Sequence, residues 1–214
     1  MTETTPRPKR DFDAAAARWD ANPMRVQLAT ATYRAIAAAV PLAPTMRALD
    51  FGCGTGLLTF LLHPHVASIT GADSSAGMLA TFREKAAPFG LADVATLHVD
   101  PEQGDTLGGP YDLIVSNMTL HHIADPAALI HLLHAHLTPG GHLCLADLDL
   151  DDGEFHADNT GVCHFGFERG ALRQMFVDAG LTAVNDVTAT AITRPTKRGV
   201  ERTFTIFMMH GIAN

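Results

Sequence analysis

Short apolar runs alternate with longer segments whose apolar residues recur at helical spacing. The apolar runs are followed by Gly, Asp or Asn, and this length and punctuation are typical of buried strands. The pattern predicts strands at 47–51, 68–72, 96–99, 112–116 and 142–148, and helices at 57–62, 77–89, 126–137 and 169–179. Strands that alternate with helices predict a mainly parallel sheet with right-handed crossovers.

The C-terminal end departs from this alternation. Residues 184–193 and 203–209 are both strand-like, and the turn between them contains Pro195 and Gly199 with no room for a helix. Two such runs predict an antiparallel hairpin. The fold class expected is therefore α/β: a Rossmann-like, seven-stranded, mainly parallel sheet with helices on both faces and a C-terminal antiparallel β-hairpin.

The N-terminal end is rich in alanine over residues 12–40 and predicts a helical cap of two helices, 12–19 and 23–40. Asn22 is a suitable N-cap, since Pro23 would then occupy the first helical position. Trp19 is a candidate anchor for this cap. The polar segment 1–11 is expected to be a disordered tail, and 12–214 a single domain.

Composition narrows the class of protein. The chain has 214 residues, 47% of them hydrophobic and 18% charged, which fits one globular domain. A formal charge of -8 argues against nucleic acid as the main partner. No run approaches the ~20 apolar residues of a membrane span, so no membrane insertion is expected. Cys53, Cys144 and Cys163 form no closely spaced pair, which fits a reduced, cytoplasmic compartment. Oligomeric state stays open.

Three alternating glycines follow the first predicted strand, at Gly52, Gly54 and Gly56. Glycine tolerates turn dihedrals and has no Cβ to hold a ligand away from the backbone. The spacing is G-x-G-x-G, whereas dinucleotide folds use G-x-G-x-x-G and phosphate loops add a lysine. An NAD-dependent oxidoreductase is an alternative reading, but the chain lacks its turn.

Carboxylates end the next two strands. Asp73 could accept hydrogen bonds from the two vicinal hydroxyls of a ribose, and Asp100 from an exocyclic amine such as that of adenine. Acidic residues would repel a pyrophosphate and tolerate a cation. This rim therefore favours a positively charged sulfonium joined to adenosine over NAD.

Four segments in order resemble the motifs of class I S-adenosylmethionine-dependent methyltransferases. They are LDFGCGTG at 49–56, GADSSAGML at 71–79, YDLIVSNM with LHH over 111–122, and LTPGGHL at 137–143. The resemblance runs from about residue 12 to the C-terminal hairpin, and it is greatest to small bacterial enzymes related to quinone-biosynthesis methyltransferases.

The resemblance implies a set of cofactor contacts. The methionine part of the cofactor would lie over the loop of Gly52, Cys53, Gly54 and Gly56, with Asp50 orienting it and Asn117 under its end. The ribose would be bound by Asp73. The adenine would be flanked by Ser74 and Met78, and its amine would contact Asp100. One departure is Pro101, which has no N–H, so a backbone donor to adenine must come from Glu102 or elsewhere.

Methyl transfer is a direct displacement that needs a base only when the acceptor atom carries a proton. The candidate bases are His121, His122, His156 and His164, whose ordinary pKa lies near neutrality. The alternative for each is a structural role as a cap or in packing.

The acidic stretch 147–156, together with residues 163–167, is expected to form one wall of the acceptor pocket. Asp147, Asp149 and Asp151 would share a face of an extended chain. They could hold a divalent ion with a histidine, but no spacing matches a named metal motif. A solvated loop is favoured, and no metal is expected.

The function expected is an S-adenosyl-L-methionine-dependent methyltransferase that acts on a small-molecule acceptor and releases S-adenosyl-L-homocysteine. The competing hypothesis is a non-catalytic protein of the same fold that binds the same cofactor. The acceptor atom stays open among oxygen, nitrogen, sulfur and carbon.

Overall fold

The computed structural model describes residues 10–100 and 105–214, and within these ranges seven strands form one sheet. Their order is β3-β2-β1-β4-β5-β7-β6. The first five strands along the chain are mutually parallel, whereas β7 is antiparallel to β5 and β6 is antiparallel to β7. The predicted fold class, with its terminal hairpin, is confirmed. Residues 1–9 of the tail expected at 1–11 lie outside the described residues, as do Pro101 and Glu102.

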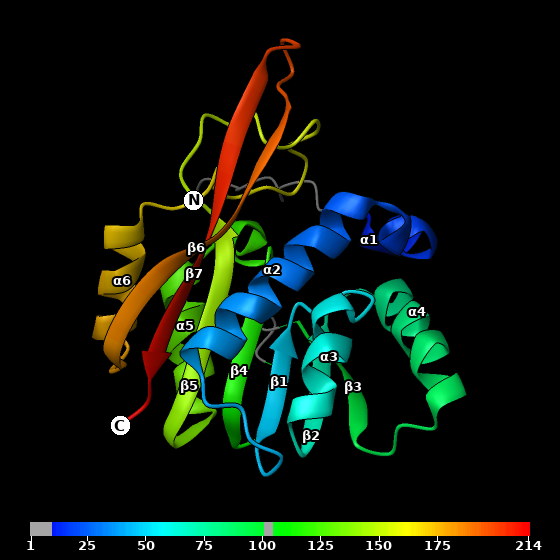
Figure 1. Cartoon of the computed structure of the whole chain (residues 1–214), viewed down its shortest axis with the longest axis vertical. Coiled ribbons are helices and arrows are strands. Elements are labelled where there is room, and N and C mark those ends of the chain that lie inside the picture. The colour runs from blue at the N-terminus through cyan, green and yellow to red at the C-terminus, as the bar shows by residue number, and fades with distance from the viewer. Residues whose placement is uncertain (1–9, 101–104) are drawn as a thin grey trace, which may run out of the picture.

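The strands are β1 Arg47–Phe51, β2 Ser68–Asp73, β3 Val94–His98, β4 Tyr111–Asn117, β5 Leu137–Leu148, β6 Thr182–Pro195 and β7 Glu201–Ile212. The helices are α1 Phe12–Ala15, α2 Pro23–Ala39, α3 Leu57–Leu62, α4 Ala76–Ala86, α5 Pro126–Ala135 and α6 Arg169–Asp178. Helices α2, α3 and α4 cover one face of the sheet, and α5 and α6 cover the other (Figure 1).

The central strands are apolar on both faces because both faces are covered. In β5, Leu143 and Leu145 pack in the core with α5 and α6, while Cys144 and Ala146 pack in the core with α2 and α3. Burial on both faces is the reason these strands appear in the sequence as continuous apolar runs.

The helical cap differs from its prediction in one respect. The helix expected at 12–19 is a single α-turn, α1, followed by a 3₁₀ helix at Ala16–Ala21. The second helix begins as predicted, because the Asn22 side chain accepts a hydrogen bond of 3.0 Å from the backbone N–H of Met24. The helix predicted at 126–137 also ends earlier than expected. Helix α5 ends at Ala135, and Leu137 is the first residue of β5.

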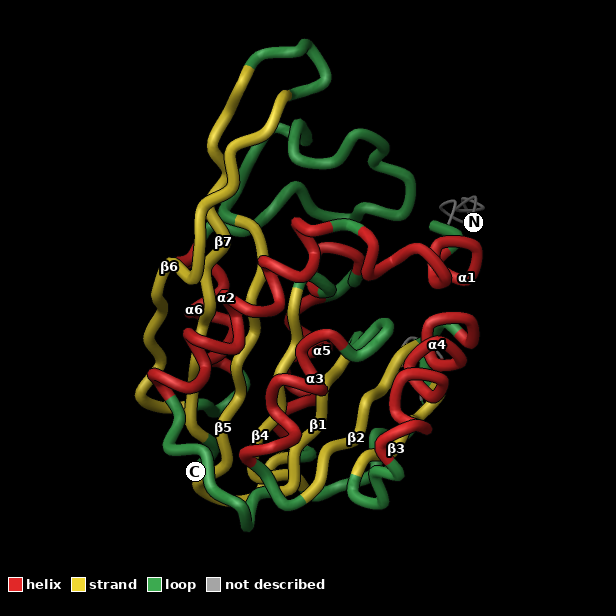
Figure 2. The backbone as a smooth tube through the Cα atoms, turned by 45° about the vertical axis from the view of Figure 1, so that its right-hand side comes forward, coloured by secondary structure: helices red, strands yellow, loops and turns green. Residues whose placement is uncertain are grey.

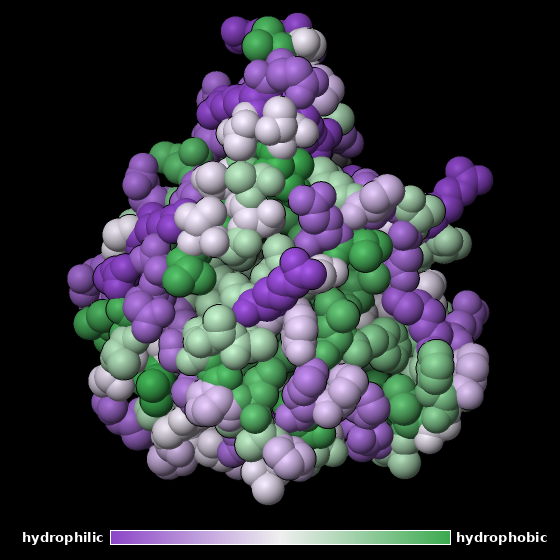
Figure 3. Space-filling view, viewed as in Figure 1, coloured by the Kyte–Doolittle hydropathy of each residue, from purple (hydrophilic) through white to green (hydrophobic). Residues whose placement is uncertain are grey.

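The hairpin of β6 and β7 projects beyond the rest of the sheet, and the loop 149–168 lies beside it and above the junction of α1 and α2 (Figure 2). The loop is closed at its base, where Asp149 pairs with Phe167 and the Arg169 guanidinium binds the Asp149 carboxylate. Surface colours are mostly hydrophilic on the hairpin (Figure 3). Among the described helices, none is both long enough and apolar enough to cross a membrane.

Candidate functional site

The glycine loop after β1 has a backbone that other residues would strain. Gly52, Gly54 and Gly56 all have positive φ, at 69°, 54° and 85°. A Cβ at Gly52 would lie 2.3 Å from Thr119 Oγ1, and one at Gly56 would lie 2.6 Å from the ring of Phe82. At Gly54 the nearest atom would be 3.8 Å away. The loop is thus packed tightly at its ends and open in the middle.

Asp73, at the end of β2, is bound to this loop. One carboxylate oxygen accepts from the Gly54 N–H and the other from the Ser75 N–H, each at 2.8 Å. Burial raises the pKa of Asp73, and the backbone N–H groups partly offset the shift. Each oxygen retains a lone pair for a further donor, so the geometry is compatible with the predicted ribose contact.

Asp50 lies beneath the loop and is buried. Its carboxylate accepts a hydrogen bond of 2.6 Å from Thr59 Oγ1. Burial raises the pKa of Asp50 to about 7, against the opposing effect of that hydrogen bond. An indirect role in orienting the cofactor therefore fits this side chain better than direct contact.

The two residues predicted to flank adenine differ in burial. Met78 is buried on α4, and its sulfur would lie 3.9 Å from a Cβ at Gly54. Ser74 is exposed, and its carbonyl is bonded to His98 Nε2 at 3.1 Å. Cys53 is buried in the loop, and burial raises the pKa of its thiol well above the ordinary value, so it is not a nucleophile.

Two further predicted contacts follow the next strands of the same sheet edge. The Asn117 side-chain oxygen accepts a hydrogen bond of 2.7 Å from Thr32 Oγ1 on α2. Its neighbour Met118 has a φ of 57°, which is unusual for a residue with a side chain. After β3, the Asp100 N–H donates to the Asp105 carboxylate at 3.0 Å.

The helical cap is bound to the glycine loop and to the start of α4 through two carboxylates that the sequence pattern does not identify. Asp13 accepts hydrogen bonds from Ser75 Oγ and from the Gly77 N–H. Asp20 accepts from Thr55 Oγ1 and forms an ion pair with Lys85. Acidic residues on a short helical segment give no sequence signal for such contacts, which depend on tertiary placement.

Three of the four candidate histidines form a cluster at the end of β4 and β5. The ring centroids of His121 and His122 are 4.2 Å apart, and those of His121 and His156 are 4.9 Å apart. His164 is separate: its Nε2 lies 3.0 Å from the Ile123 carbonyl oxygen, and its ring contacts Phe167. These contacts favour a structural role for His164.

His121 and Asp147 form a fully buried pair. His121 Nδ1 is 2.8 Å from one Asp147 oxygen, and both oxygens also accept backbone N–H groups, those of Leu148 and His121. Burial alone would raise the pKa of Asp147, but the hydrogen bonds from His121 and from the backbone N–H of Leu148 hold it below its ordinary value. Because an ionised carboxylate only accepts, the proton is assigned to Nδ1. Nε2 is then a free acceptor, buried and without a partner in the described residues.

The neighbouring histidines are neutral at pH 7. Burial lowers the pKa of His122 to about 4 and that of His156 to about 3. His122 Nδ1 is 2.7 Å from the Gly161 carbonyl oxygen. His156 Nε2 is a second buried nitrogen without a partner among described atoms. Two unpaired imidazole nitrogens therefore lie close together.

The three alternating aspartates do not share a site. Asp147 binds His121, Asp149 binds Arg169, and Asp151 caps the turn at Gly153. Within residues 10–100 and 105–214, no group of three or more His, Cys, Asp or Glu side chains is arranged to hold a metal ion.

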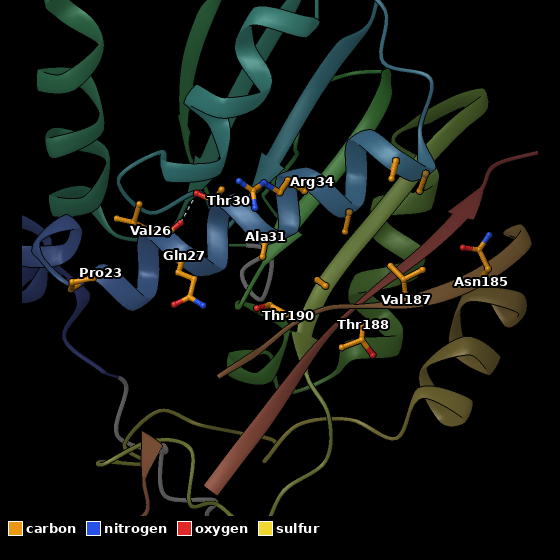
Figure 4. A pocket seen from close by; sticks show the side chains of 14 residues that line it. Pro23, Val26, Gln27, Thr30, Ala31, Arg34, Asn185, Val187, Thr188 and Thr190 are labelled. Atoms are coloured by element: carbon orange, nitrogen blue, oxygen red, sulfur yellow. Dashed lines mark hydrogen bonds between the residues drawn. The ribbon is translucent and has the colours of Figure 1, made fainter. Parts of the chain in front are cut away.

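A hollow in the described structure lies away from these residues. It is a groove of about 860 Å³ between α2 and β6, bordered by Val26, Ala31, Arg34, Val187 and Thr190 among others (Figure 4). None of the predicted site residues lines it. The groove is therefore distinct from the candidate site.

Comparison with known proteins defines the class. A family model described as a methyltransferase domain matches residues 24–186, and the chain belongs to this family. With its sheet order and loop, it is a class I S-adenosylmethionine-dependent methyltransferase by fold. An uncharacterised methyltransferase of Schizosaccharomyces pombe is 32% identical over 152 residues, covering 64% of this chain and 54% of the relative.

Two further matches, one to a curated protein and one to a solved structure, are similar to this chain. A trans-aconitate 2-methyltransferase of Delftia acidovorans is 41% identical over 112 residues, covering 50% of this chain and 40% of that protein. The structure of phosphoethanolamine N-methyltransferase 2 of Haemonchus contortus, in complex with S-adenosyl-L-methionine, matches with a TM-score of 0.70 and 13% identity, covering 95% of this chain and 60% of that one. The chain thus spans about half the length of the curated relatives named here.

Proposed function

We propose that the chain binds S-adenosyl-L-methionine at the glycine loop and transfers its methyl group to a small-molecule acceptor. The observation that carries the proposal is the buried His121–Asp147 pair beside that loop. Thr119, two residues before His121, lies against Gly52, and its hydroxyl donates to the Gly52 carbonyl at 3.3 Å. A base with a free nitrogen thus adjoins a loop that suits the cofactor.

The residues present fit the cofactor. The loop is open above Gly54, and Asp73 presents a carboxylate at the position suited to a ribose. When bound, S-adenosyl-L-methionine supplies an electrophilic methyl group on a positively charged sulfur. The loop and the strand-end carboxylates would hold it.

His121 supplies the remaining chemistry for an acceptor hydroxyl. His121 Nε2 would take up the proton of the acceptor hydroxyl as the oxygen is methylated, and the bound cofactor would supply the methyl group and keep the electron pair of the broken bond on its sulfur. The resulting imidazolium is stabilised by the ionised Asp147, which also fixes the ring orientation. General-base assistance of this kind contributes about 10²- to 10⁴-fold in rate. The name of the Delftia relative supports a small organic acceptor.

Calorimetry tests the cofactor half of the proposal. The protein should bind S-adenosyl-L-methionine and S-adenosyl-L-homocysteine. Asp73→Asn should lower the affinity for both compounds by about tenfold or more, because a charged hydrogen-bond acceptor is lost. Asp93→Asn is the matched control, since Asp93 is exposed just before β3 and pairs with His63. Binding of NAD without binding of either sulfur compound would contradict the proposal.

Turnover tests the catalytic half. Release of S-adenosyl-L-homocysteine is measured over hydroxy acids, phenols, carboxylic acids, amines and thiols. Methylation of a hydroxyl that depends on His121 supports the proposed base. Methylation of a carboxylate that does not depend on His121 would contradict its proposed role as the base. Cofactor binding with no turnover would favour the non-catalytic alternative.

A further inference from the structure

Two arginines of the helical cap region, Arg10 and Arg25, form no ion pair with a carboxylate of the described residues. Arg25 Cζ is 3.5 Å from the centroid of the Trp19 ring, and its Nη1 donates to the Trp19 carbonyl oxygen at 3.0 Å. Arg10 Cζ is 5.8 Å from the centroid of the Phe12 ring.

Aromatic contacts connect these arginines to the histidines. The Phe12 ring centroid is 5.9 Å from that of Trp19 and 5.2 Å from that of His122. Gly161 contacts both sides: its carbonyl oxygen is bonded to His122, and a Cβ on it would lie 2.7 Å from the backbone nitrogen of Arg10. Arg10, Phe12, His122 and the loop 149–168 thus form one compact wall.

The charge of these two arginines is only partly compensated, because no described carboxylate lies within ion-pair distance of either guanidinium. Arg169 is the contrast, because two carboxylates bind its guanidinium and raise its pKa. Burial lowers the pKa of the half-buried Arg25 and the charge of Arg10 lowers it further, while the charge of Asp20 acts in the opposite direction. Hydrogen bonds from Thr160 lower the pKa of the exposed Asp158, and the charge of Arg10 contributes to that shift. The charge of Arg10 also lowers the pKa of His122 and of His156. Like charges that are partly removed from water cost free energy unless an anion joins them.

We propose that Arg10 and Arg25 bind an oxyanion of the methyl acceptor, the carboxylate of a small organic acid. A guanidinium offers paired donors that match the two oxygens of a carboxylate, and a phosphate group shares this chemistry. The acid would then be held between the helical cap and the loop 149–168, with its reactive end toward His121. The identity of the acceptor as substrate rests on the proposed function, whereas the anion site does not.

Calorimetry with three probes tests the site in protein saturated with S-adenosyl-L-homocysteine. Malonate and inorganic phosphate are the anionic probes, and malonamide is the neutral control. Malonate should bind, malonamide should not, and stronger binding of phosphate than of malonate would assign the site to phosphorylated acceptors. Arg25→Gln and Arg10→Gln should each lower the affinity for malonate by about tenfold, since a pair of charge-assisted hydrogen bonds is lost. Arg18→Gln is the matched control, because Arg18 is exposed on the same cap.

A second variant separates charge from packing. Arg25→Lys loses the stacked guanidinium and keeps the charge, so it should retain more malonate affinity than Arg25→Gln while both unfold at similar temperatures. Equal binding of malonate and malonamide, no binding of either anion, or equal affinity in Arg25→Gln and wild type would overturn the proposal. Malonate binding by a protein that never turns over would sink only the proposed methyl transfer.

Discussion

The two sides of the candidate site are built in different ways. The cofactor side comes from one continuous stretch, β1 to α4, in which Asp73 binds the loop at Gly54. The acceptor side is assembled from the helical cap, the end of β4, the end of β5 and the loop 149–168. A local unit can be recognised as a motif, whereas an assembled wall is recognisable only once the chain is folded.

The two sides also differ in how they hold protons. On the cofactor side, burial raises the pKa of Asp50 to about 7. On the acceptor side, burial lowers the pKa of His122 and His156, and His121 keeps a free nitrogen only because Asp147 fixes its other one. His122 and His156 are therefore neutral beside His121, whose acceptor nitrogen suits the proposed proton transfer.

The largest effect expected separates turnover from cofactor binding. Asp147→Asn should lower kcat by about 100-fold or more, because the amide no longer fixes the His121 tautomer or stabilises its imidazolium. The affinity for S-adenosyl-L-homocysteine, measured by calorimetry, should stay unchanged.

The matched control for this prediction is His164→Gln, since His164 contacts the Ile123 carbonyl outside the cluster. Its kcat should change little. Equal losses in the two variants would show that the acceptor side responds only to general disturbance of the loop 149–168.

A smaller effect is expected where the two sides meet. Gly52→Ala would place a Cβ 2.3 Å from Thr119 Oγ1 at a φ of 69°, so it should lower the free energy of unfolding by about 2–3 kcal/mol. Gly140→Ala has a similar φ of 78° with no atom within 4 Å, so it should cost about 1 kcal/mol from backbone strain alone. Chemical denaturation measures both, and equal costs would mean that Thr119 moves aside easily.

The sequence could predict the elements and the cofactor loop because their signals are local. Strand β1 and helix α3 follow directly from apolar runs punctuated by glycine. It could not predict that Asp147 would bind His121 while Asp149 binds Arg169, because alternation along a strand does not say which neighbours each face meets. Nor could it separate His164 from the other histidines, since that depends on where the loop 149–168 folds back.

The smallest effect expected is a pH dependence of opposite sign on the two sides. His122 and His156 have folded pKa values of about 4 and about 3, below the ordinary value of 6.5, so the unfolded chain takes up their protons first. Their contribution to stability is full above pH 6.5 and is lost as the pH falls toward those values. The loss by pH 5 should be roughly 1 kcal/mol for each histidine after allowance for partial exposure.

Asp50 acts in the other direction. Its folded pKa of about 7 lies above the unfolded value of 3.8, so the folded state takes up its proton first, and stability from this group grows as the pH falls from 7 toward 4. Thermal unfolding measures the stability that is lost when the pH is lowered from 7.5 to 5. This loss should be smaller for His156→Gln than for wild type and larger for Asp50→Asn. Parallel curves for the three proteins would contradict the assigned protonation of both sides. If only Asp50→Asn differs from wild type in its pH dependence, the assignment of neutral histidines in the cluster is wrong.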